Sequence, residues 1–183
     1  LVSNTSANGS GFLNAPINIP ASVAGLHTIA ASGTLNSGNT TFTVITGISI
    51  NPTSGATGSS LTVSGSGFGA SETGISVVYD GAAMASASAD TKGSWNVSFI
   101  VPASASGVRT ITATGPTNSA TTIYSVTPKI SASRPNGAPG SSITLTGTGF
   151  GASETGITVT YDGTPIATAP PSISANNKGG WTA

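Results

Sequence analysis

Four carboxylates occur in two matching pairs and are the side chains best placed to do chemistry. Glu72 and Glu154 lie in copies of the same peptide, and Asp80 and Asp162 follow them at the same spacing. Paired carboxylates can act as an acid and a base, and Ca²⁺ binds several oxygen atoms at once. Each Asp precedes a Gly, however, which indicates a hairpin turn. We therefore favour structural roles for all four and retain them only as weak Ca²⁺ candidates.

No residue pattern predicts catalysis or a bound cofactor. His27 is the only histidine, and a Ser–His–Asp arrangement needs a carboxylate that residues 1–47 lack. The absence of cysteine excludes thiolate metal sites and disulfides. The glycine-rich stretch at 65–69 lacks the Lys and Ser or Thr of a phosphate-binding loop. The sequence thus predicts a protein that is not an enzyme, with no catalytic and no cofactor-binding residue.

Four Asn-x-Ser/Thr sequons are candidate glycosylation sites: Asn4, Asn8, Asn39 and Asn96. A surface rich in hydroxyl groups and poor in charge suits a secreted glycoprotein.

The sparse charge also excludes some partners. Five basic and five acidic residues give a net charge of zero, which removes the electrostatic basis for binding nucleic acid or an anionic membrane. No apolar run approaches the ~18 residues that span a bilayer. Low hydrophobicity combined with high charge is typical of disorder, and this chain lacks the charge. We expect a folded protein with no membrane span in this segment.

The elements that must position these residues follow an internal repeat. Residues 48–81 and 130–163 are identical at 22 of 34 positions at an offset of 82. The same offset relates 27–33 to 109–115, and an offset of 86 relates 92–95 to 178–181. Such self-similarity is typical of tandem domains. We predict the C-terminal half of a repeat at 1–47, a complete repeat at 48–129 and the N-terminal part of a third at 130–183.

This division raises the question of how the two partial repeats are completed. The favoured interpretation is that the chain is a window on a longer continuous array. The alternative is that residues 130–183 of one molecule are completed by residues 1–47 of the next, which would give a head-to-tail fibre. In both cases we expect exposed half-cores, for example at Ile143, Leu145, Ile157 and Tyr161.

The complete repeat has a hydrophobic period of two, which is typical of strands. Turn residues separate about seven short runs, which predicts an all-β, immunoglobulin-like sandwich. The linkers Thr46-Gly47 and 127–129 are short or contain Pro, so we expect the repeats to stack as a rod. The loops 65–74 and 147–156 are predicted to lie at the domain ends and to set the inter-domain angle, with Glu72 and Phe68 contributing. The predicted core comprises Leu61, Val63, Phe68, Ile75, Val77, Tyr79, Trp95, Val97, Phe99, Ile111 and Ala113.

A family resemblance rests on these same residues. The run PTSGATGSSLTVSGSGFG at 52–69 resembles the opening of IPT/TIG-type immunoglobulin-like domains. The runs ADTKGSWNVSF at 89–99 and GVRTITATG at 107–115 are similar to immunoglobulin-like tandem repeats of bacterial and archaeal surface proteins. The resemblance implies the fold and a cell-surface location. Some such domains cross-link a buried Lys to an Asn, but a turn lysine such as Lys92 is normally solvated.

Two functions remain open from the sequence. The first is a structural segment of an extracellular filament, stalk or surface-layer protein, whose partners are copies of itself or adjacent repeats in the fibre. The second is an adhesin or carbohydrate-binding module, with glycans or other cell-surface components as partners. The second function needs exposed aromatic side chains or a binding loop, for which the repeated GASETGI peptide is the candidate.

Overall fold

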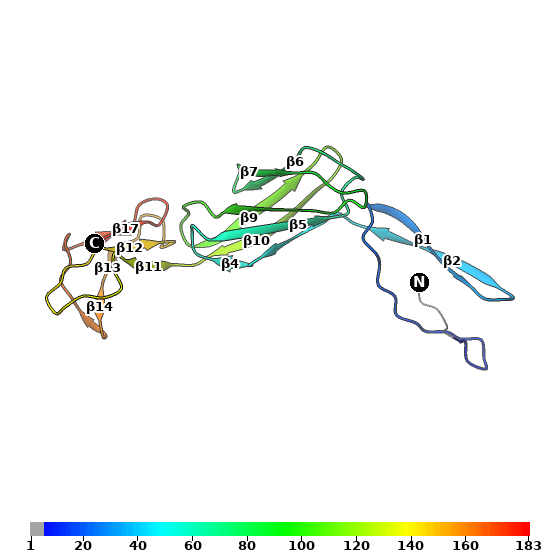
Figure 1. Cartoon of the computed structure of the whole chain (residues 1–183), viewed down its shortest axis with the longest axis horizontal. Helices are drawn as coiled ribbons and strands as arrows, with labels where there is room; N and C mark the ends of the chain where they lie inside the picture. The colour runs from blue at the N-terminus through cyan, green and yellow to red at the C-terminus, as the bar shows by residue number, and fades with distance from the viewer. Residues whose placement is uncertain (1–5) are drawn as a thin grey trace.

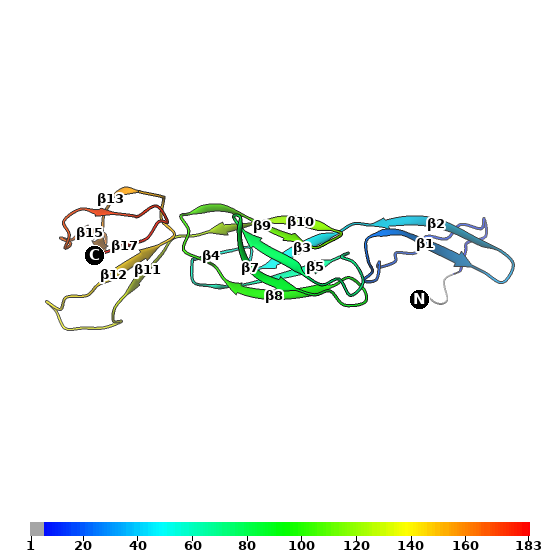
Figure 2. The same cartoon turned by 90° about the horizontal axis from the view of Figure 1, so that it is seen from above.

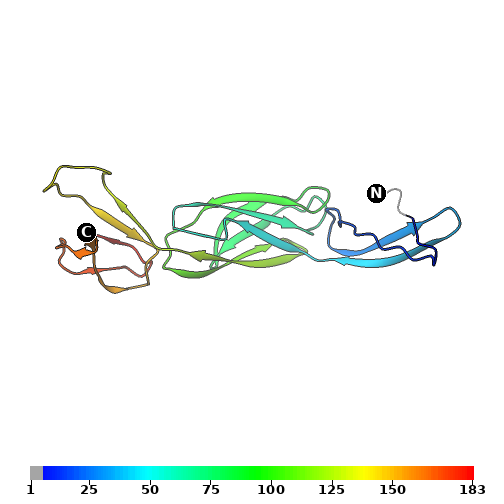
Figure 3. The same cartoon turned by 90° about the horizontal axis from the view of Figure 1, so that it is seen from below.

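The computed structural model describes residues 6–183, and this part of the chain consists of strands and loops without a helix. Figure 1 shows a hairpin at one end, a sandwich in the middle and a smaller strand-containing part at the other end of an elongated molecule. Figures 2 and 3 show the same succession from two further directions. The predicted all-β class and the immunoglobulin-like sandwich are confirmed.

The central sandwich consists of two sheets. The three-stranded sheet has the order β3-β5-β8, and the five-stranded sheet has the order β4-β10-β9-β6-β7. Neighbouring strands are antiparallel except β4 and β10, which are parallel. The bounds are β3 Gly47–Asn51, β4 Ser54–Gly55, β5 Ser60–Ser66, β6 Ile75–Tyr79, β7 Ala82–Ala87, β8 Trp95–Ile100, β9 Gly107–Thr114 and β10 Ser119–Val126.

Alternation along each strand places apolar side chains between the two sheets. In β5, Leu61 and Val63 are fully buried while Ser64 is exposed, which is the expected pattern when one face of a sheet is covered. Every predicted core residue is buried except Val97, which is partly exposed on the edge strand β8 but still packs against the core. The core also contains residues that the prediction omitted: Ala89, Val101, Tyr124 and Val126.

Aromatic side chains close one end of the sandwich. Phe68 is fully buried and meets Trp95 edge to face, with ring centroids 5.3 Å apart. The Trp95 ring lies directly over Gly65, where any side chain would collide with the indole. The sequence therefore requires glycine in the middle of a buried strand face, because the ring occupies the space of a side chain.

The turn between β6 and β7 has the geometry that the Asp-Gly pair predicts. Asp80 and Gly81 both have positive φ, at 46° and 85°, and Tyr79 pairs with Ala82 across the turn. Two successive positive φ values match the twist of a two-residue hairpin. The turn assignment is confirmed.

The N-terminal part contains one long hairpin. It consists of β1, Gly25–Ser32, and β2, Ser37–Val44, paired from Gly25↔Val44 to Ser32↔Ser37. These bounds and this register are those of β9 and β10 displaced by 82 positions. Residues 12–20 form no strand, although later strands of a sandwich were expected throughout 1–47.

The C-terminal part repeats the beginning of the sandwich with shorter strands. Its sheets are β11-β12-β17, β13-β16 and β14-β15. Phe150 and Trp181 reproduce the aromatic pair, again with centroids 5.3 Å apart. The bounds are β11 Lys129–Ala132, β12 Leu145–Thr148, β13 Thr155–Ile157, β14 Thr160–Tyr161, β15 Thr164–Pro165, β16 Ile173–Ser174 and β17 Trp181–Thr182.

Candidate functional site

The loop after β5 holds the sandwich against the hairpin that precedes it. The carbonyl oxygen of Gly67 accepts a hydrogen bond from the Thr46 hydroxyl at 2.8 Å and another from the Ala24 N–H at 3.2 Å. Gly67 has a φ of 72°, and a Cβ there would lie 2.7 Å from the Ile45 carbonyl oxygen. The loop and the linker are thus in backbone-to-backbone contact, which leaves no room for a side chain.

The equivalent loop makes the same kind of contact at the other end of the sandwich. The Ser106 N–H donates to the Phe150 carbonyl oxygen at 2.9 Å. A Cβ on Gly149 would lie 2.7 Å from the carbonyl oxygen of Thr127. These contacts place loops 65–74 and 147–156 against the neighbouring parts of the chain, and their role in setting an inter-domain angle stays a prediction.

Both junctions also use linkers of equal length. β2 ends at Val44 and β3 begins at Gly47, while β10 ends at Val126 and β11 begins at Lys129. Two residues therefore separate the strands at each junction, and the first linker is not the shorter one that the sequence suggested. The division of the chain at 47/48 and 129/130 stays a prediction.

A surface depression lies at the second junction. The sandwich contributes Asp80 and Arg109 to its lining, and the C-terminal part contributes Ala152 and Lys178. Arg109 forms an ion pair with Asp80 at 3.2 Å and donates to the Ala105 carbonyl oxygen at 2.5 Å. The other carboxylate oxygen of Asp80 accepts a hydrogen bond from the N–H of Thr110, the residue that follows Arg109. These contacts all lie within the sandwich, so the Asp80 carboxylate stabilises the end of the sandwich that faces the junction.

Glu72 stabilises the loop 65–74, which follows β5, from inside the sandwich. It is 8% exposed and accepts hydrogen bonds from the N–H of Gly69 at 2.5 Å and from the N–H and hydroxyl of Thr117 at 3.1 and 3.0 Å. Burial alone would raise the pKa of Glu72, but the hydrogen bonds outweigh it and hold the pKa below its ordinary value. The Glu72 carboxylate is thus an ionised acceptor that ties β9–β10 to the loop.

This environment corrects one expectation. Glu72 and Phe68 were predicted to act on the inter-domain angle, but both are buried within the sandwich. The junction contacts come from Gly67, Thr46 and Ala24 instead. The reason is that these two side chains point into the sandwich, while the backbone of Gly67 faces the neighbouring part.

The Ca²⁺ candidates do not gather into one cluster. Glu72 and Asp80 have the partners described above, Glu154 accepts the Gly151 N–H at 2.6 Å, and Asp162 lies in a positive-φ turn like that of Asp80. Within residues 6–183, no group of three or more His, Cys, Asp or Glu side chains is arranged to hold a metal ion. Calcium binding by any of the four stays a prediction.

Three of the glycosylation candidates are exposed. Asn8, Asn39 and Asn96 have exposed side chains, and Asn8 accepts backbone hydrogen bonds from Ser10 and Phe12 within its own turn. Asn4 lies outside the described residues. Glycosylation of all four stays a prediction.

The remaining candidates for chemistry have structural surroundings. His27 lies on β1, and its Nε2 is 2.9 Å from the carbonyl oxygen of Val23, which precedes that strand. Lys92 and Asn96 are exposed, on either side of the buried Trp95, so their side chains do not form a buried pair for cross-linking. In residues 6–183, no helix is long and apolar enough to cross a membrane.

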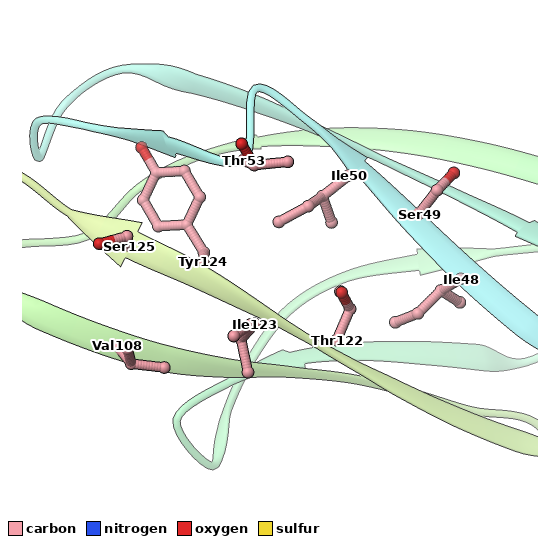
Figure 4. A pocket seen from close by; sticks show the side chains of 9 residues that line it. All are labelled: Ile48, Ser49, Ile50, Thr53, Val108, Thr122, Ile123, Tyr124 and Ser125. Atoms are coloured by element: carbon pink, nitrogen blue, oxygen red, sulfur yellow. The ribbon is translucent and has the colours of Figure 1, made fainter.

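A second depression runs between the two sheets beside β3 and β10. Figure 4 shows Ile48, Ile50 and Tyr124 directed toward the space between these strands, with Ile123 and Val108 at its outer side. Ile123 and Val108 are 61% and 63% exposed. β4 pairs only with the last two residues of β10, Ser125 and Val126, so the rest of this edge of β10 has no neighbouring strand.

Sequence reasoning missed the junction contacts of Gly67 and Thr46 and the buried Tyr124. The signal for Tyr124 was present, because its phase along β10 matches that of the buried Val126. The junction contacts left no such signal, since a backbone carbonyl acceptor is common to every residue type.

Comparison with protein families places the sandwich and its flanking residues in a known group. Residues 44–127 match the model of the IPT/TIG domain. The match begins at the last residue of β2 and ends just after β10, so it covers the sandwich and its first linker. The chain has no significant match among curated proteins or among solved structures.

Proposed function

Because residues 44–127 are an IPT/TIG domain, an immunoglobulin-like module, we propose that the protein is a non-catalytic repeat segment of an extracellular filament, stalk or surface-layer protein. Such modules are often found in adhesion or signalling proteins, are commonly extracellular or surface-associated, and are typically not enzymes. The filament role and the tandem repetition are the specific parts of the proposal.

The observation that carries the proposal is a junction used twice. At each end of the sandwich, a two-residue linker joins the neighbouring parts, and a glycine of the adjacent loop lies against a carbonyl of that linker. Gly67 approaches the Ile45 carbonyl, and 82 positions later Gly149 approaches the Thr127 carbonyl. A short linker packed against a loop leaves little freedom for bending between neighbours. A contact reused at the same spacing is what a regular, stiff array needs.

The composition supports the same proposal. The chain has only ten charged residues, so repulsion between like-charged neighbours in a fibre is small. Its partners would be adjacent repeats or further copies of itself.

Immuno-electron microscopy tests this function. An antibody raised against the sandwich, applied to intact cells of the source organism, is expected to label filaments, stalks or a surface layer at regular spacing. Label confined to the cell interior would contradict the proposal, and so would label scattered over the surface without any fibre or layer. Secreted material without such structures would count against it in the same way.

An adhesin or carbohydrate-binding module is the second candidate, and the depression in Figure 4 favours it. Ile123 and Val108 offer exposed apolar surface there. Against it, every aromatic side chain of the sandwich is buried, so none can stack on a sugar ring: Phe68, Tyr79, Trp95, Phe99 and Tyr124. A glycan array decides between the two: binding that Ile123→Asp abolishes would support the module, and absence of binding would exclude glycans as its ligand.

A further inference from the structure

Met84 is the only sulfur-containing side chain of the protein, since the sequence has one methionine and no cysteine. Sulfur-containing side chains are common targets of oxidation in proteins, and a methionine thioether becomes a sulfoxide. Met84 lies in β7, which is the edge strand of the five-stranded sheet in the complete sandwich. What oxidation would do there depends on where the side chain points.

A β-bulge at Met84 directs its side chain toward the interior. Val77 pairs with Ala85 and Val78 with Ala83, so Met84 is the one residue of β7 without a partner in β6. An extra residue of this kind bends a strand and changes the direction of its side chains. Met84 and Ala85 are therefore both partly buried, although successive side chains of a regular strand point to opposite faces.

The strand that carries Met84 lies along a seam between the two sheets. β7 is the edge of the five-stranded sheet and β8 is the edge of the three-stranded sheet, and the two strands contact each other along one side of the sandwich (Figure 2). Met84 packs against the buried core cluster while it remains partly exposed. Partial exposure gives a small oxidant access to the sulfur, and the packing makes the core sensitive to a change of that sulfur.

We propose that Met84 is an oxidation site at which hydrogen peroxide lowers the stability of the sandwich. The Met84 sulfur attacks one peroxide oxygen and the O–O bond breaks. A proton passes from the transferred oxygen to the departing one, which leaves as water. The sulfur loses two electrons and the peroxide gains two. The inference goes beyond the proposed function, because it concerns control of the fold by an oxidant and applies wherever the protein acts.

The loss of stability follows from the polarity of the sulfoxide. Oxidation converts a flexible apolar side chain into a polar one, and a buried polar oxygen without a hydrogen-bond donor is unfavourable. On the core side of β7, Met84 sulfoxide must bury its oxygen or turn it toward water. The first outcome places an unpaired polar group against the core, and the second removes apolar cover from it.

The repeat contains a form of the same position that has no sulfur. Ile166 stands 82 positions after Met84. The Ile166 N–H donates to the carbonyl oxygen of Val159, the counterpart of Val77, at 3.0 Å. Isoleucine at this place therefore lies beside the counterpart of β6. Met84→Ile is a substitution that the chain itself uses, and it serves as the matched control that cannot be oxidised to a sulfoxide.

Peptide mass spectrometry tests the site of oxidation. The whole chain is treated with hydrogen peroxide while circular dichroism shows that it remains folded. We expect one added oxygen atom, located on Met84. A folded chain whose Met84 stays unmodified, under conditions that oxidise it fully in guanidinium-unfolded protein, would overturn the proposal.

Denaturation of the treated and untreated chain tests the effect on stability. We expect the denaturation midpoint of the wild-type chain to fall after oxidation, and that of Met84→Ile to stay unchanged by the same treatment. Met84→Leu is the second control, should isoleucine fail to fold at this position. Equal midpoints of the wild-type chain before and after complete oxidation would overturn the proposal. An equal fall in the control variant would do so too, because the damage would then lie elsewhere.

Reduction of the sulfoxide gives a test that needs no variant. Methionine sulfoxide occurs as two epimers, each reduced by its own methionine sulfoxide reductase. Treatment of the oxidised chain with both reductases should remove the added oxygen and restore the midpoint. A midpoint that stays low after the oxygen has been removed would show that another modification caused the loss and would overturn the proposal.

Discussion

Trp95 is the side chain around which one end of the sandwich closes. Its ring packs edge to face with Phe68 and covers Gly65, so it fills a space bounded by two strands and a loop. Gly65 has no side chain that could fill this space if the ring were removed. Removal of the ring therefore leaves a cavity.

We predict that Trp95→Ala lowers the free energy of unfolding by about 3–5 kcal/mol. Chemical denaturation of the whole chain, followed by circular dichroism, measures the change. Ile123→Ala is the control, because Ile123 is 61% exposed and its truncation should change stability by less than about 0.5 kcal/mol. Equal effects of the two substitutions would contradict the assignment of Trp95 to the core.

Glu72 gives a prediction about acid. Its folded-state pKa is lowered below the ordinary value of 4.5, so the ionised carboxylate stabilises the fold. That stabilisation is complete above pH 4.5 and is lost as the pH falls through the lowered folded-state pKa. We expect Glu72→Gln to cost about 1–3 kcal/mol at neutral pH and progressively less in acid.

Glu154→Gln is the matched control, because Glu154 lies in an identical peptide but is exposed and accepts only the Gly151 N–H. Denaturation curves at several pH values compare the variants. Exposed Asp90, whose pKa is lowered by hydrogen bonds from the N–H groups of Ser94 and Lys92, is common to both proteins and does not affect their difference. If the two variants lost equal stability, the buried network of Glu72 would not be the cause.

At the scale of elements, the junction depends on a backbone contact that only glycine permits. Gly67 and Gly74 have nearly equal φ, at 72° and 73°, but a Cβ would strike the Ile45 carbonyl only at Gly67. Both positions therefore carry the same conformational penalty for alanine, about 1–2 kcal/mol. Only at Gly67 would the added Cβ also push against the linker and force the β1–β2 hairpin to move.

We predict that Gly67→Ala changes the angle between the β1–β2 hairpin and the sandwich, whereas Gly74→Ala changes stability alone. Small-angle scattering of each variant measures its maximum dimension and its flexibility. A scattering curve of Gly67→Ala that superimposes on that of Gly74→Ala would show that the contact does not set the angle.

At the scale of the whole molecule, stability is concentrated in the centre. The pairs β1–β2 and β9–β10 have the same strand lengths and the same register, but only β9–β10 has a sheet packed over its apolar face. An isolated hairpin is marginally stable at best in water. Local opening should therefore differ greatly between two segments of almost the same structure.

We predict fast amide hydrogen exchange in β1–β2 and slow exchange in β9–β10. Mass spectrometry of peptides measures the exchange of both strand pairs in one experiment, so each pair serves as the reference for the other. Similar protection of the two pairs would mean that the hairpin gains stability from contacts outside its own strands.

Local patterns in the sequence were sufficient for the fold. The alternation of Leu61 and Val63 with polar neighbours placed the core, and Asp80-Gly81 placed a turn. The repeat offset of 82 also predicted strands in equivalent places, and β1–β2 matches β9–β10 residue for residue. These features depend on the alternation of apolar and polar residues and on the φ preferences of single residues. Both can be read from the sequence without knowledge of distant contacts.

Only the tertiary structure decided which of two identical peptides becomes a buried network and which stays open. Glu72 and Glu154 have the same neighbours in sequence, yet Glu72 is buried because β9–β10 brings Thr117 to it, and Glu154 is exposed because the C-terminal part has no such strands. The junctions were decided in the same way, since the carbonyl of Gly67 gains its role only when Thr46 lies against it. Burial and contact depend on segments distant in sequence, and identical residues acquire different energies when those segments differ.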